Sequence, residues 1–119
     1  MHNKKYKWYK IADAIDDLQF DENSLMQIEV AGKKICVAKT SKSLAACTAK
    51  CPHAGGLMAE GFLDKNDSIV CPVHRYTFSL INGRDTTGEG YYLKIYPVQE
   101  NDSGIFIGIE EGGLFSWLK

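Results

Sequence analysis

The stretch that decides the fold is Cys51-Pro-His-Ala-Gly-Gly56, and a related stretch, Cys71-Pro-Val-His74, follows further along the chain. Each places one cysteine close to one histidine, although the 119 residues contain only 4 cysteines and 3 histidines. A proline after each cysteine fixes the backbone φ angle of the turn. The two glycines allow the backbone to come close to a bound group. The two stretches therefore predict two loops that serve one site.

Length and composition indicate one globular domain, residues 1–119, with 45% hydrophobic and 24% charged residues. A net charge of −1 argues against a nucleic-acid-binding surface, which is normally basic. No apolar run is long enough to span a membrane, and the first twenty residues show no secretory signal. We therefore expect a cytoplasmic protein, in which cysteines are metal ligands or buried thiols rather than disulfides.

The rest of the chain predicts short strands. Residues 25–30 alternate between apolar and polar side chains, which is typical of a half-buried strand. The other expected strands are residues 35–38, 44–47, 68–71, 91–96 and 104–109, with turns at 31–34, 40–43, 65–67 and 82–83. Ile11, Ile15 and Leu18 have helical spacing and predict one short helical turn. The expected fold class is all-β, with an antiparallel β-sandwich or barrel as its base.

Two thiolates and two imidazoles, one of each from either loop, make a four-ligand metal site. One candidate is a closed tetrahedral zinc site. The other is a [2Fe-2S] cluster with both cysteines on one iron and both histidines on the other. Zinc sites of this composition usually take two cysteines from one turn and two histidines from another. Here each loop supplies one of each, which favours the cluster and leaves zinc as the alternative.

The pattern Cys51-x-His53 and Cys71-x-x-His74 resembles the signature of Rieske [2Fe-2S] proteins. Residues 51–84 are similar to the cluster-binding subdomain of Rieske-type ferredoxins and oxygenase domains, and the similarity extends over nearly the whole chain. The resemblance implies a Rieske fold, with a cluster-binding β subdomain at about residues 48–82. It also implies one [2Fe-2S] cluster held by Cys51, His53, Cys71 and His74, with both histidines reaching the surface.

The chain departs from the high-potential members of that family. Gly56 and Val73 stand where those members have two further cysteines, joined as a disulfide. Tyr76 and Phe78 stand where they have a serine and a tyrosine hydroxyl near the cluster. Hydrogen bonds to cluster sulfur stabilise the reduced form, so their loss lowers the potential. The proline-rich loop of the high-potential members is also missing from this chain. We expect a potential of about −150 mV, the low end of the Rieske range.

The resemblance implies a one-electron carrier that is not itself an enzyme and has no catalytic residues. A flavin-dependent reductase would supply the electron, and an oxygenase or other oxidoreductase would accept it. The alternatives are a small Rieske subunit of a larger complex, such as a nitrite reductase or split oxygenase, and a structural zinc-binding module.

Several residues outside the ligand motif have simpler interpretations. Cys36 lies between Ile35 and Val37 and is expected to be a buried hydrophobic residue. Cys47 could be a resolving thiol for Cys51, but a redox role is the less favoured interpretation. Trp8 and Trp117 are expected to be packing residues. The apolar C-terminal tail, residues 110–119, is expected to pack on the domain or on a partner.

Overall fold

The structure is a computed structural model and describes residues 5–53, 55–86 and 88–111. Within these ranges the chain forms strands and two short 3-10 helices, η1 and η2. In chain order these are β1 (Tyr6–Ala12), η1 (Ile15–Asp17), β2 (Leu25–Val30), β3 (Lys33–Lys39), β4 (Leu44–Thr48), η2 (Met58–Glu60), β5 (Phe62–Leu63), β6 (Ile69–Val70), β7 (Thr77–Phe78), β8 (Ile95–Tyr96), β9 (Val98–Asn101) and β10 (Gly104–Glu110).

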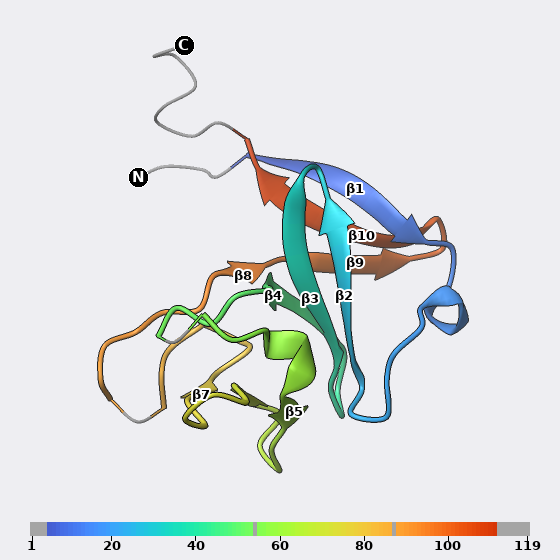
Figure 1. Cartoon of the computed structure of the whole chain (residues 1–119). Coiled ribbons are helices and arrows are strands. Elements are labelled where there is room, and N and C mark those ends of the chain that lie inside the picture. Colours follow the sequence, from blue (N-terminus) through green and yellow to red (C-terminus); the bar gives the residue numbers. More distant parts are fainter. Residues whose placement is uncertain (1–4, 54, 87, 112–119) are drawn as a thin grey trace.

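Two larger sheets form the base, and a small sheet carries the loops of interest. The base contains β1-β10-β9 and β2-β3-β4-β8, and the small sheet has the order β5-β6-β7. All neighbouring strands pair antiparallel. Figure 1 shows β5 and β7 in the lower part of the view, beside the lower ends of β2 and β3. The all-β antiparallel fold expected from the sequence is confirmed. Neither helix within the described ranges has the length and hydrophobicity to cross a membrane.

The first hairpin follows the sequence pattern closely. Strand β2 has the predicted bounds, with Gln27 and Glu29 exposed and the alternate positions more buried. The turn needs only Ala31 and Gly32, which adopt φ angles of 51° and 79°. Positive φ at both central residues is the mark of a type I′ turn, which matches the twist of antiparallel strands. The predicted turn at 31–34 is therefore too long, because Lys33 and Lys34 already belong to β3.

The hydrophobic core consists of two clusters. The first lies between the sheets of the base and includes the buried isoleucines Ile107 and Ile109 of β10. The second joins the base to the small sheet and includes Met58, Phe78 and both loop cysteines, Cys51 and Cys71. The second cluster thus anchors the base of the two loops in packed side chains.

The short helical turn predicted near the start of the chain is confirmed as η1, whereas the strand predicted at 91–96 is largely wrong. Ile11 belongs to β1, because the edge of β10 pairs with this segment as far as Ala12, and only Ile15–Asp17 is helical. Strand β8 covers only Ile95–Tyr96, and Tyr92 instead forms an isolated bridge with Arg84.

Other predictions have mixed outcomes. In the predicted turn at 82–83, Gly83 has a positive φ of 78°. Trp8 is 36% exposed and packs over Gly108, where an added Cβ would lie 3.0 Å from the indole ring. Trp117 and residues 112–119 of the tail lie outside the described residues.

Candidate cluster-binding site

Both cysteine–histidine loops are closed by a hydrogen bond from the cysteine backbone. The Cys51 N–H donates to the Gly56 carbonyl at 2.7 Å, and the Cys71 N–H donates to the Tyr76 carbonyl at 2.8 Å. The second loop turns through His74 and Arg75, whose φ angles are 62° and 57°. These left-handed conformations are uncommon for residues other than glycine and are typical of functional loops.

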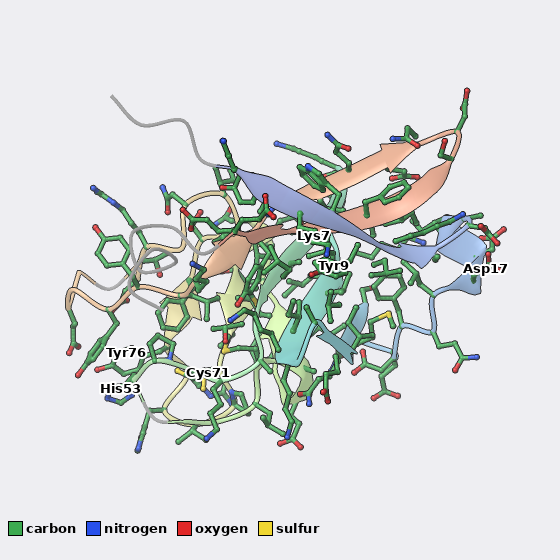
Figure 2. All side chains as sticks on the ribbon, turned by 90° about the horizontal axis from the view of Figure 1, so that it is seen from above. Lys7, Tyr9, Asp17, His53, Cys71 and Tyr76 are labelled. Atoms are coloured by element: carbon green, nitrogen blue, oxygen red, sulfur yellow. The ribbon has the colours of Figure 1, made fainter. Side chains whose placement is uncertain are left out.

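The two loops bring the four predicted ligands into one site. Cys51 and Cys71 are buried, at 3% and 0% exposure, and their thiols are neighbours. His53 is half-buried and His74 is exposed, and their ring centroids are 5.7 Å apart. Figure 2 shows His53 and Cys71 on the side of the molecule opposite Asp17. The cysteines thus form an inner pair and the histidines an outer pair.

A close contact between the loops depends on Gly56. A Cβ at this position would lie 2.8 Å from Val73 Cγ2 and 3.2 Å from Cys71 Sγ. The first of these distances is shorter than real side chains allow, so a larger residue would displace Val73. Gly56 and Val73, the positions of the disulfide in high-potential Rieske proteins, therefore face each other without a covalent link.

The environment of Cys71 favours a protonated thiol when no metal is bound. Burial, together with the neighbouring Cys51 thiol, raises the pKa of Cys71 to about 11, although a hydrogen bond from the Val73 backbone lowers it. Burial disfavours the charged thiolate, whereas the N–H donor stabilises it. Metal binding to Cys71 would therefore release a proton, as it does in other thiolate sites.

The half-buried His53 carries an orphaned nitrogen. Its Nδ1 is buried and has no hydrogen-bond partner among the described residues. A buried polar atom without a partner is costly and calls for an explanation. A lone pair beside two thiols and a second imidazole is suited to metal coordination, so this donor set fits an iron–sulfur cluster.

The geometry also bears on the zinc alternative. Within residues 5–53, 55–86 and 88–111, no group of three or more histidine, cysteine, aspartate or glutamate side chains is placed to hold a metal ion. A tetrahedral zinc site needs its four donors around one point. The observed division into two pairs instead suits a cluster that contains two irons.

The aromatic contacts that surround His53 could not be predicted from the sequence pattern. Tyr76 stacks on the His53 ring, with centroids 3.7 Å apart and planes 12° apart. Tyr91 meets both rings edge-on, with centroid distances of 5.0 Å to His53 and 5.6 Å to Tyr76. The Tyr76 hydroxyl donates a hydrogen bond of 2.9 Å to Glu89, which raises the pKa of Tyr76 to about 12. Tyr76 therefore remains a neutral donor at physiological pH.

Phe78, at the other position where high-potential members have a hydroxyl, is fully buried in the second core cluster. Its ring supports the base of the site and has no polar atom to offer. At these two positions, the Tyr76 hydroxyl donates to Glu89, and Phe78 has no hydroxyl to donate.

The remaining two cysteines lie in the base. Cys36 and Cys47 are directly opposite each other on β3 and β4, and both are fully buried. A hydrogen bond with Cys36 and burial raise the pKa of Cys47. The prediction that Cys36 is a buried hydrophobic residue is confirmed. The neighbouring thiol of Cys47 is that of Cys36 rather than that of Cys51.

Among the proteins to which the sequence is similar, two differ clearly in size. It is 33% identical over 63 residues to the 3-phenylpropionate/cinnamic acid dioxygenase ferredoxin subunit of Photorhabdus laumondii, covering 52% of this chain and 60% of that subunit. It is 31% identical over 72 residues to cholesterol 7-desaturase nvd 1 of Ciona intestinalis, covering 60% of this chain and 15% of the desaturase. The chain thus spans less than two thirds of the length of either relative.

The fold is also similar to that of a ferredoxin whose structure has been solved. The ferredoxin of carbazole 1,9a-dioxygenase from Nocardioides aromaticivorans superposes with a TM-score of 0.71 at 22% identity, over 84% of this chain and 95% of the ferredoxin. The model of the Rieske [2Fe-2S] domain matches residues 7–96, a segment that contains both loops and the small sheet. The chain therefore belongs to the Rieske [2Fe-2S] domain family.

Proposed function

We propose that this chain is a one-electron carrier in which Cys51, His53, Cys71 and His74 hold a [2Fe-2S] cluster. The observation that carries the proposal is the inner pair of buried thiols beside the buried, unpartnered Nδ1 of His53. When bound, the cluster supplies a one-electron redox couple. Neutral imidazoles in place of two thiolates make it easier to reduce than an all-cysteine cluster.

The residues around the site divide the remaining tasks. The buried cysteines hold one side of the site away from water, and the second core cluster keeps them in place. His74 is exposed and His53 half-buried, so the histidine side faces a docking protein. This arrangement shortens the distance that an electron must cover between the site and its partner.

The proposed potential is at the low end of the Rieske range, about −150 mV. Gly56 and Val73 supply no disulfide, the Tyr76 hydroxyl is engaged by Glu89, and Phe78 has no hydroxyl. Fewer hydrogen bonds to the cluster leave its reduced form less stabilised.

The proposed partners are redox proteins. A flavin-dependent reductase is the donor, and an oxygenase or other oxidoreductase is the acceptor. The similarity to a dioxygenase ferredoxin subunit supports this role, in which the chain turns over no substrate itself. We further propose that residues 1–119 are one cytoplasmic domain whose cluster-binding part covers about residues 48–82.

A second candidate is a Rieske component within a larger oxidoreductase. The similarity to the Ciona desaturase favours it, because there the matched segment is a small part of a longer chain. The native size of the protein in extracts of its source distinguishes the two. A free monomer supports the carrier, and a stable large complex supports the component.

The ligand assignment is tested by exchanging each histidine for cysteine. His53→Cys or His74→Cys should change the electron paramagnetic resonance (EPR) spectrum of the reduced protein or abolish the cluster, because one imidazole is lost. His2→Cys, at the third histidine of the chain, is the matched control and should leave the spectrum unchanged. An unchanged spectrum in His53→Cys would refute its role as a ligand.

A further inference from the structure

The ring that stacks on His53 belongs to a residue with a second, charged contact. We propose that Tyr76, held by Glu89, is a positioning residue that fixes the plane of the His53 imidazole and lowers the redox potential of the site. This inference rests on the proposed role of His53 as a ligand. It assigns a function to the position where high-potential Rieske proteins have serine.

The stack restricts the orientation of His53. Tyr76 covers one face of the imidazole at 3.7 Å, and Tyr91 meets the ring edge-on. Rotation of the imidazole about its Cβ–Cγ bond would tilt the ring and drive one of its edges into the Tyr76 ring. The stack therefore fixes the plane of the imidazole, and in this orientation Nδ1 is buried. Partners that orient a metal-binding histidine in this way commonly tune the metal site.

Glu89 fixes Tyr76 in turn and adds a charge. Its carboxylate accepts the Tyr76 hydroxyl at 2.9 Å, so the phenol ring is held at both its face and its hydroxyl end. A negative charge behind an electron-rich ring opposes the addition of an electron to a site in contact with that ring. Because Glu89 is exposed, dissolved salt should screen this effect.

Three variants separate the stack from the charge. Tyr76→Leu removes the aromatic ring, Tyr76→Phe keeps the ring but loses the hydrogen bond, and Glu89→Gln keeps an acceptor but loses the charge. Tyr92→Leu is the matched control, since Tyr92 is a neighbouring tyrosine that is 60% exposed. Each protein is purified with its iron and sulfide content measured, so that only loaded protein is compared.

Two measurements report on the proposal. Voltammetry at low and high salt gives the midpoint potential. Pulsed EPR of the reduced protein, with nitrogen-15 in the histidines, gives the hyperfine coupling of each coordinating nitrogen. Tyr76→Leu should shift the coupling of one histidine and leave the other unchanged. At low salt, Tyr76→Phe and Glu89→Gln should be more than half reduced at the wild-type midpoint potential, and the difference should shrink at high salt. Tyr92→Leu should match the wild type.

A loaded Tyr76→Leu protein with wild-type couplings and potential would overturn the proposal. If that variant does not load, Tyr76→Phe and Glu89→Gln decide the matter, and unchanged potentials at low salt would overturn it. Failure of the proposed function has a different signature. In that case the wild type itself shows no histidine nitrogen couplings from a [2Fe-2S] centre.

Discussion

At the scale of single residues, the site depends on how closely the two loops approach each other. An ideal Cβ on Gly56 would lie 3.4 Å from the Cβ of Val73, close to the separation of the two Cβ atoms in a disulfide. The loops therefore already have the spacing of a disulfide-linked pair, and only the two side chains differ from it. The low potential proposed for this chain would therefore require no change in the backbone of the two loops.

This spacing predicts the outcome of a double substitution. Gly56→Cys with Val73→Cys should form a disulfide on oxidation and stabilise the protein by up to about 3 kcal/mol, as expected for a loop of about 15 residues. Mass spectrometry should find a loss of two hydrogens between peptides that contain these positions, and thermal unfolding measures the gain. Free thiols at both positions after oxidation would show that the loops are further apart than described.

At this scale, a contact can be predicted from the sequence when its partners are close together in the chain. The grouping of the two Cys/His pairs in one region could be predicted, because each pair is fixed by short spacing within one loop, and the role of Cys51, His53, Cys71 and His74 as ligands stays a prediction. The stack of Tyr76 on His53 could not be predicted, because it joins two loops that are distant in the sequence. Its anchor at Glu89 lies on a third segment with no regular structure.

At the scale of the elements, two turns hold the small sheet against the base. Ser41, in the turn between β3 and β4, donates backbone and side-chain hydrogen bonds to the carboxylate of Asp67. Asp67 lies in the turn between β5 and β6 and has a positive φ of 61°. These hydrogen bonds connect two elements that are 26 positions apart in the chain.

The Ser41 contact predicts a pH-dependent effect of a substitution. Hydrogen bonds from Ser41 lower the pKa of Asp67 below its ordinary value of 3.8, so the folded state favours the ionised carboxylate. The stabilisation is present above that value and is lost as pH falls through the lower folded pKa. Asp67→Asn should therefore reduce the melting temperature at pH 7, with a smaller difference at pH 3.

The control for this prediction is Asp102→Asn, at an exposed position in the turn between β9 and β10. It should leave the melting temperature unchanged at both pH values. A melting temperature of Asp67→Asn equal to that of the wild type at pH 7 would show that the Ser41 contact contributes nothing to stability.

The elements also differ in how well the sequence predicts them. Strands β2 and β10 are predicted almost to the residue, because apolar and polar side chains alternate in β2 and isoleucine recurs at every second position in β10. The β8 region was predicted too long, since Tyr91 and Tyr92 are residues with high strand propensity that instead serve a loop beside the site. The first strand, β1, is determined by its pairing with the distant strand β10 rather than by the local propensity of its residues.

At the scale of the whole molecule, the second core cluster joins the base and the small sheet. It contains residues of β3, β4, β6 and β7 together with Cys51 and Cys71. The side chains that support the site therefore also hold the two parts of the fold together. Damage to this core should affect stability and cluster binding at once.

Phe78 is the most informative position in this core because it is large and fully buried. Phe78→Ala should lower the free energy of unfolding by about 3–5 kcal/mol, as expected for the loss of a buried aromatic ring. It should also lower the iron content of the purified protein. Denaturant unfolding and iron analysis check the two effects. Phe62→Ala, at a position that is 38% exposed, is the control and should have a much smaller effect on both. A Phe78→Ala protein with wild-type stability but no iron would contradict a shared core.

The most direct test of the account is the inorganic content of the purified wild-type protein. The account predicts about two iron atoms and two acid-labile sulfides per chain, with a visible absorption that bleaches on reduction with dithionite. A colourless protein with one zinc ion per chain and no acid-labile sulfide would contradict it.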